Sequence, residues 1–141
     1  MCGRFTLRTR LVGIVEGFGV DEVGEGFIKD SASYNIAPSR QVAVVTQEGG
    51  SRRLTRARWG LIPKWDAQKG KLLFNARAET VARKPTFKKA FMGSRCIIVA
   101  DGFYEWKRGR AGKVPYYFRL ATAAPFGFAG LMERGEGRRE C

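Results

Sequence analysis

The first two residues, Met1 and Cys2, carry the most distinctive chemistry in this sequence. Initiator methionine is normally removed when the second residue is small, so we expect the mature chain to begin with Cys2. The ordinary pKa of an α-amine is about 7.7–8.0, which leaves a useful fraction unprotonated near neutral pH. Such an amine attacks an aldehyde to give a Schiff base, and the neighbouring thiol can then close a five-membered thiazolidine ring. Cys2 is therefore a candidate nucleophile, although a small residue here can equally lack any chemical role.

The sequence contains no histidine, which excludes Ser-His-Asp and Cys-His catalysis, histidine general bases and histidine metal ligands. The three cysteines, Cys2, Cys96 and Cys141, are far apart and form no CxxC pair. An odd number of widely spaced cysteines favours neither a disulfide framework nor a zinc site. We therefore expect neither a metal nor a cofactor.

Positive charge dominates the composition and is concentrated after residue 50. The chain has 26 basic and 13 acidic residues, a net charge of +13. Residues 1–50 hold five basic and six acidic residues, whereas residues 51–141 hold 21 basic and seven acidic residues, a net charge of +14. A basic field of this size, with arginine outnumbering lysine by 17 to nine, favours a polyanionic partner, most often nucleic acid. A solvated basic face without a partner is the alternative.

The length of 141 residues and a hydrophobic content of 44% indicate one globular domain with its own core. No apolar run approaches the roughly 20 residues that a membrane helix needs. The first ten residues lack the apolar stretch of a signal peptide. We expect a monomer that is cytoplasmic and makes no contact with membranes.

Short apolar and alternating runs between glycine, proline and charged turns predict mostly strands. The expected strands cover residues 3–8, 41–46, 54–61, 95–100, 102–107, 114–120 and 126–131. Helical spacing predicts short helices over Leu11–Phe18 and Pro85–Met92, and the glycine-rich segment Arg108–Lys113 predicts a hairpin turn. The expected fold class is α+β, mostly antiparallel. Residues 1–131 form the expected domain, and residues 132–141 are expected to be a disordered charged tail.

Seven short motifs, spread in order over nearly the whole chain, point to one family. They are MCGRF (1–5), YNIAPS (34–39), WGLIPKW (59–65), FNARAETV (74–81), ADGFYEWK (100–107), PYYF (115–118) and FAGL (128–131). Together they resemble the SRAP family, the SOS-response-associated peptidase proteins, whose members shield abasic sites in single-stranded DNA. The resemblance implies a barrel-like α+β fold with a few short helices and a role in the DNA damage response.

The resemblance also implies three active-site residues. Cys2 corresponds to the residue that captures the ring-opened deoxyribose aldehyde and forms the DNA–protein crosslink. Asn75 corresponds to an asparagine that orients the nucleophile or the sugar, although asparagine is also common as a turn or strand cap. Glu105 corresponds to the general acid–base, and its alternative is a solvent-facing strand residue paired with an arginine.

Five further residues match family positions that contact DNA. Arg4 and Arg77 correspond to residues that hold the backbone around the lesion, although both can be plain surface charges. Trp106 and Trp65 are candidates for stacking on bases, and the alternative for Trp106 is a core aromatic on an alternating strand. Pro38 matches a loop that touches DNA, and a rigid turn explains it equally well.

Family members are longer than this sequence, and their additional segment carries a histidine that is absent here. The resemblance therefore implies a C-terminally truncated member, with incomplete closing strands and doubtful peptidase, hydrolase or lyase activity. We expect recognition of abasic sites in single-stranded DNA with a covalent thiazolidine crosslink through Cys2, in a bacterium near the nucleoid. The alternatives are a non-covalent single-stranded nucleic-acid-binding module and an inactive truncated paralogue.

Overall fold

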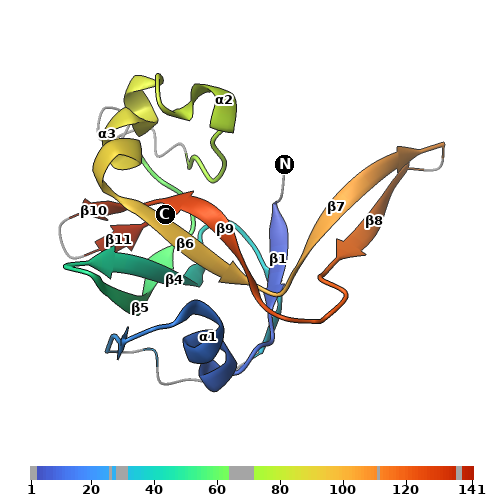
Figure 1. The fold of residues 1–141 in the computed structure, drawn as a ribbon. Helices are drawn as coiled ribbons and strands as arrows, with labels where there is room; N and C mark the ends of the chain where they lie inside the picture. The colour runs from blue at the N-terminus through green and yellow to red at the C-terminus, as the bar shows by residue number, and fades with distance from the viewer. Residues whose placement is uncertain (1–2, 26, 28–31, 64–71, 111, 136–137) are drawn as a thin grey trace.

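The computed structural model describes residues 3–25, 27, 32–63, 72–110, 112–135 and 138–141 (Figure 1). A four-stranded sheet, here called sheet A, has the order β3-β1-β7-β8, and all its neighbours are antiparallel. Its strands are β1 (Arg4–Leu7), β3 (Ser33–Ile36), β7 (Gly102–Gly109) and β8 (Gly112–Phe118).

The second sheet, sheet B, has the order β10-β11-β5-β4-β6-β9, with β2 also paired to β5. Its strands are β2 (Glu22–Val23), β4 (Gln41–Glu48), β5 (Ser51–Arg58), β6 (Arg95–Ala100), β9 (Phe126–Leu131), β10 (Glu133–Gly135) and β11 (Arg138–Glu140). Only the short pairings of β2 and β11 with β5 are parallel. The fold is therefore α+β and mostly antiparallel, as expected, and over the described residues neither sheet closes into a barrel.

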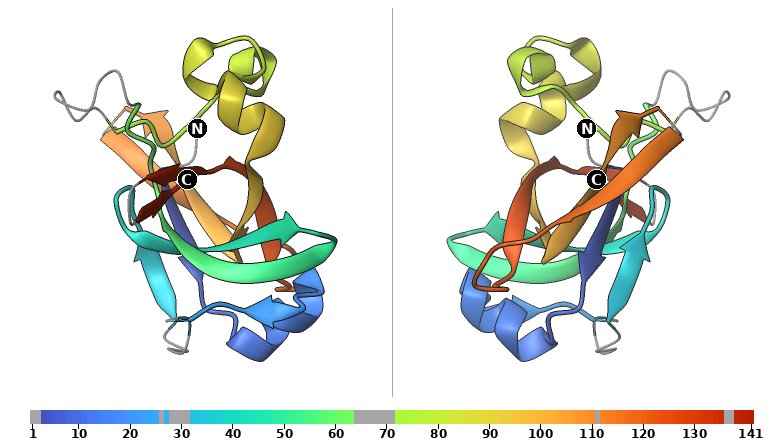
Figure 2. Two further views of the ribbon diagram at one scale, coloured as in Figure 1. Left: turned by 90° about the vertical axis from the view of Figure 1, so that its left-hand side faces the viewer. Right: turned by 90° about the vertical axis from the view of Figure 1, so that its right-hand side faces the viewer.

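Three short helices accompany the sheets in the described part of the chain: α1 (Leu11–Phe18), α2 (Ala78–Val81) and α3 (Pro85–Gly93). Helix α1 ends at Gly19, whose φ of 57° is the left-handed conformation that glycine adopts at low cost. Pro85 opens α3, where its missing N–H is not needed by the helix. Figure 2 shows α1 at one end of the molecule and α2 and α3 at the other. None of the helices in the described ranges has the length and apolar character required to cross a membrane.

Alternation along β4 divides the core into two layers. Val42 and Val44 point into a cluster between the sheets that also holds Phe5 and Trp59, whereas Ala43 and Val45 point to the opposite face. Helix α1 packs Ile14 into that second cluster. An eight-residue strand with five consecutive buried residues is explained by apolar layers on both of its faces.

The hairpin of β7 and β8 extends away from the rest of the molecule (Figure 1). Strand β7 is buried at Gly102 and is exposed from Trp106 onward, and every residue of β8 is exposed. The strands continue to Gly109 and from Gly112, so the turn is shorter than the predicted segment Arg108–Lys113. The outer half of the hairpin is therefore a two-stranded arm with solvent on both faces.

The described part of the last ten residues, 132–135 and 138–141, differs from the expected disordered tail. Met132 is buried, and β10 and β11 pair with each other, with β11 adding to the edge of sheet B beside β5. The carbonyl of Cys141 accepts a hydrogen bond from the N–H of Gly60. These contacts join distant parts of the chain, which the local charge pattern of the segment does not reveal.

Candidate functional site

The register of β1 on β7 brings the predicted acid–base residue to the start of the chain. Arg4, the first residue of β1, is paired with Tyr104 of β7. Glu105 follows Tyr104, and because the strands are antiparallel, Glu105 lies beside the backbone that precedes Arg4. Cys2 itself lies outside the described residues. The N-terminal end of β1 alongside β7 can be followed in Figure 1.

Glu105 projects from the core side of sheet A. Alternation places its side chain on the same face as Phe103, which is the cross-strand partner of the buried Phe5. Tyr116 lies directly opposite Glu105 on β8. Glu105 is half-buried, in contrast to the exposed residues that follow it on β7. Glu105 therefore lies at the point where the exposed arm leaves the core.

Asn75 is exposed and lines a cavity of about 550 Å³ on this same side of the molecule, together with Phe5 and Phe74. The backbone next to Asn75 is held by contacts of the preceding residue, Phe74, with Trp59. The indole N–H of Trp59 donates to the carbonyl of Phe74 over 3.1 Å, and the two rings pack edge to face with centroids 6.0 Å apart. Asn75 and Glu105 therefore both lie on the Phe5 side of sheet A.

Trp59 also anchors the loop that contains Pro38. The carbonyl of Trp59 accepts the N–H of Ser39 over 2.7 Å, and its own N–H donates to the carbonyl of Arg40 over 2.9 Å. Ser39 has a φ of 74°, a left-handed conformation that is unfavourable for a residue with a side chain. Pro38 is half-buried in this anchored loop. A single tryptophan thus positions two of the predicted motifs.

Arg4 and Trp106 lie on the opposite face of sheet A from Glu105. Arg4 shares its face with Tyr104, and its guanidinium donates to Oδ1 of Asn35 over 2.8 Å. Trp106 is 42% exposed, so it is not a core aromatic, and its ring lies 6.5 Å from that of Tyr104. Of the predicted residues that belong to sheet A, Glu105 therefore lies on one face and Arg4 and Trp106 lie on the other.

Arg77 lies two residues after Asn75, at the start of α2. It is exposed, and its carbonyl accepts the N–H groups of Thr80 and Val81. The remaining predicted residue, Trp65, lies outside the described residues. Arg77 therefore lies close to Asn75, because only Ala76 separates them in the chain.

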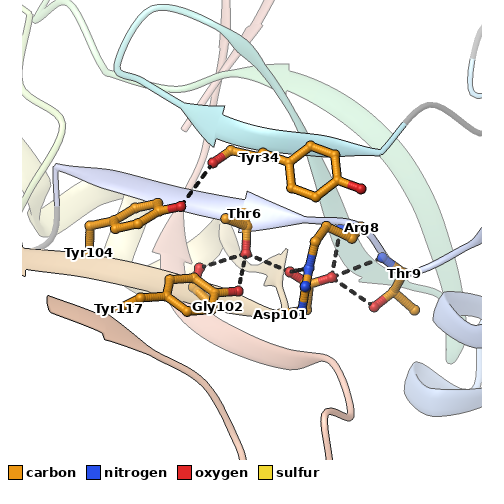
Figure 3. A network of polar contacts seen from close by, with 8 residues as sticks. All are labelled: Thr6, Arg8, Thr9, Tyr34, Asp101, Gly102, Tyr104 and Tyr117. Atoms are coloured by element: carbon orange, nitrogen blue, oxygen red, sulfur yellow. Dashed lines mark hydrogen bonds and ion pairs between the residues drawn. The ribbon is translucent and has the colours of Figure 1, made fainter.

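A polar network around Asp101, which the motif analysis did not single out, fixes the other end of β1 (Figure 3). Asp101 is 2% exposed and joins β6 to β7. Its carboxylate accepts hydrogen bonds from the hydroxyl of Thr6 over 2.6 Å, from the N–H and hydroxyl of Thr9 over 2.9 and 3.1 Å, and from the N–H of Arg8. Burial alone would raise the pKa of Asp101, but these hydrogen bonds outweigh it and lower the pKa below its ordinary value.

Tyr117 of β8 completes this network. Its hydroxyl lies 2.9 Å from the hydroxyl of Thr6, and its ring faces the guanidinium of Arg8 at 6.0 Å. A side chain at Gly102 would overlap the Tyr117 hydroxyl, so glycine is required there. The only sequence signal was an acidic residue placed between two apolar strands. The network holds β1, β7 and β8 in one register and thereby positions Glu105.

The other two cysteines are not reactive groups. Cys96 and Cys141 are buried, and burial raises the pKa of Cys96 to about 11 and that of Cys141 to about 12. Both remain thiols near neutral pH and are therefore poor nucleophiles. Within the described ranges, no group of three or more Cys, Asp or Glu side chains is placed to hold a metal ion.

Comparison with known proteins relates this site to one family. A family profile described as SOS response associated peptidase (SRAP) matches residues 1–140. Abasic site processing protein YoqW from Bacillus subtilis (strain 168) is 45% identical over 138 residues, covering 95% of this chain and 61% of that protein. Abasic site processing protein YedK from Escherichia coli (strain K12) is 33% identical over 107 residues, covering 73% of this chain and 47% of that protein.

Solved structures show the same fold. The X-ray structure of a protein from Bacteroides thetaiotaomicron matches with a TM-score of 0.83 at 27% identity, covering 99% of this chain and 66% of that chain. A structure from Bordetella bronchiseptica matches with a TM-score of 0.74 at 27% identity, covering 94% of this chain and 64% of that chain. The chain therefore spans less than two thirds of the length of these relatives.

Proposed function

Because the chain belongs to the SOS response associated peptidase (SRAP) family, we propose that it recognises abasic sites in single-stranded DNA and captures them covalently through Cys2. The relatives named abasic site processing proteins support the lesion as the target. The observation that carries the proposal is the register of β1 on β7, which brings the half-buried Glu105 beside the backbone that precedes Arg4.

The proposed reaction begins once removal of Met1 frees the α-amine of Cys2. An abasic deoxyribose is mostly a closed hemiacetal, and Glu105 assists its opening to the aldehyde by proton transfer. The amine attacks the aldehyde carbon, and loss of one water molecule gives the imine. The thiol sulfur then bonds to the imine carbon while its proton passes to the nitrogen. The product is a thiazolidine, and no oxidant or reductant is consumed.

Asn75 and the cations have positioning roles in this proposal. Asn75 has an amide that can donate and accept hydrogen bonds but cannot transfer a proton at neutral pH, so it orients the sugar or the amine. Arg4 and Arg77 are exposed and able to bind phosphates on either side of the lesion. Trp106 is exposed enough to stack on a base, an interaction of about 1–3 kcal/mol.

A denaturing mass measurement tests the covalent step. The purified protein, with Met1 removed, is mixed with a single-stranded oligonucleotide that carries one abasic site. We expect an adduct that survives denaturation and has the summed mass of protein and DNA minus one water. Cys2→Ala is expected to form no adduct while still binding the DNA.

Two outcomes would contradict the proposal in different ways. An equal adduct yield from Cys2→Ala would assign the chemistry to another residue. Binding without any adduct, for a chain whose Met1 is shown by intact mass to be absent, would leave a non-covalent single-stranded DNA-binding module. The exposed aromatic and basic side chains of sheet A favour that module as the second candidate.

A further inference from the structure

The β7–β8 arm has two chemically different faces. Alternation along β7 directs Phe103 and Glu105 to the core side and Tyr104, Trp106 and Arg108 to the other side, here called the outer face. The two faces carry different kinds of side chain. Phe103 stacks on Phe118 with centroids 5.2 Å apart, whereas the outer face carries polar, aromatic and cationic side chains.

The outer face is a continuous ladder of cross-strand pairs. Tyr104 pairs with Tyr117, Trp106 with Pro115, and Arg108 with Lys113. The rings of Tyr104 and Tyr117 lie 5.0 Å apart, and those of Tyr104 and Trp106 lie 6.5 Å apart. The ladder therefore presents adjacent, mutually tilted aromatic rings near the core and two cations at its tip.

The two cations at the tip face each other directly. Like charges on directly opposed residues destabilise a strand pair. Arg108 and Lys113 are both exposed, and across the described ranges no ion pair joins either to a carboxylate. Residues 107–113 contain four basic and no acidic residues, so the tip is a strongly positive segment on a projecting arm. An anion between the two side chains would offset their repulsion.

We propose that the outer face binds the DNA strand that flanks the lesion, with Arg108 and Lys113 holding one backbone phosphate. The proposal rests on the proposed function, which places the lesion near Glu105 at the base of the arm. A strand advances by about 3.4 Å per residue, so Arg108 lies about 7 Å beyond Trp106. Aromatic stacking near the lesion and phosphate binding beyond it is a common combination in single-strand-binding proteins.

Equilibrium binding over a range of salt concentrations tests the proposal. The probe is a single-stranded oligonucleotide with a central reduced abasic site, which has no aldehyde and cannot react with Cys2. The test variant is Arg108→Ala/Lys113→Ala. Its matched control is Lys88→Ala/Lys89→Ala on α3, which removes two exposed cations elsewhere and changes the net charge equally. Thermal unfolding of both variants verifies that they fold like the parent.

We expect the log–log salt slope of the test variant to be shallower than that of the parent by about 0.7, the value for one phosphate contact on a single strand. The control variant keeps the parent slope. Two shortened oligonucleotides are also tested: one ends one nucleotide to the 5′ side of the lesion, and the other ends one nucleotide to its 3′ side. We expect the difference in slope between the test variant and the parent to disappear on one of them. That result would place the contact on one flank of the DNA.

Three results would overturn the proposal: a test variant with the parent slope, a control with an equal change, or a difference that persists on both shortened oligonucleotides. Failure of the proposed function gives a different result. In that case the parent fails to crosslink a reactive abasic oligonucleotide, whatever the two double variants do with the unreactive probe.

Discussion

In the proposed reaction, the rate of capture depends on the carboxyl of Glu105. Glu105→Gln preserves the shape of the side chain and removes its ability to exchange a proton. General acid–base assistance is worth about 10²–10⁴-fold, so we expect crosslinking to slow by about 10²-fold or more with nearly unchanged DNA affinity. Asn75→Ala, which removes a positioning group, is expected to slow the reaction less.

A time course of adduct formation on one abasic oligonucleotide measures these rates for the parent and each variant. Cys2→Ala gives the baseline without adduct. Crosslinking of Glu105→Gln at the parent rate would show that Glu105 is an ordinary strand residue.

Asp101 stabilises the fold in a pH-dependent way. Asp101→Asn replaces one of the two carboxylate oxygens by an NH₂ group, which can only donate. That NH₂ group would face the N–H and hydroxyl donors of Thr6, Arg8 and Thr9, and a hydrogen bond would be lost. Leaving a buried hydrogen-bonding group unsatisfied costs about 1–3 kcal/mol, and we expect the free energy of unfolding at pH 7 to fall by that amount. Asp21→Asn is the control, because exposed Asp21 accepts a backbone N–H from Arg52 over 2.8 Å and its loss should change stability by less than about 0.5 kcal/mol.

The sign of the pH effect follows from the lowered pKa of Asp101 in the folded protein. Its stabilisation is fully present above the unfolded-state pKa of about 3.9 and is lost as the pH falls through the lower folded-state pKa. Denaturant unfolding at pH 7 and at steps below pH 4 should show the parent converging on Asp101→Asn in acid. A constant difference between them at all pH values would contradict this assignment.

The motifs name candidate residues for the site, but they do not show how the structure holds those residues. Asn75 and Glu105 follow from their motifs, and the structure places both on the Phe5 side of sheet A. The anchoring by Trp59 and the network of Asp101 depend on contacts between residues far apart in sequence, such as Thr6 and Asp101. No local pattern encodes such contacts.

Elements with a strong apolar pattern were predicted at or close to their bounds. Helix α1 and strands β6 and β9 begin and end at the predicted residues, because apolar periodicity and the following turns coincide there. Strand β2 and helix α2 were missed because two and four residues are too few to show a period. Strands β10 and β11 were missed because their residues are charged and their pairing with each other and with β5 is not visible locally.

The sequence pattern predicted the β7–β8 hairpin but not the different roles of its two faces. Alternation in residues 102–107 predicted a strand, and glycines predicted the turn. Only the register, with Arg4 opposite Tyr104 and Arg108 opposite Lys113, shows that one face adjoins the N-terminal backbone while the other carries a row of cations and aromatics. Register depends on which face of each strand is buried and, within a hairpin, on the turn, so the cross-strand partners are known only once the packing is known.

At the scale of the whole molecule, charge is distributed unevenly along the chain and over the fold. Residues 1–50, which contribute α1 and the first strands, are close to neutral, whereas residues 51–141 carry a net charge of +14. That second part includes the arm and the segment that positions Asn75. A field of one sign around the proposed site would attract a polyanion and hold it along the surface.

Binding of single-stranded DNA should therefore weaken steeply as salt increases. Each phosphate contact releases condensed counterions, so the plot of log affinity against log salt concentration should have a slope of about −0.7 per contact on single strands. We expect a slope steeper than about −2, since Arg4, Arg77 and the tip of the arm each offer at least one phosphate contact. Fluorescence anisotropy with an undamaged oligonucleotide at several salt concentrations measures the slope, and an oligonucleotide with a neutral backbone is the control. A slope near zero with the charged DNA would show that the basic surface is solvated and is not where DNA binds.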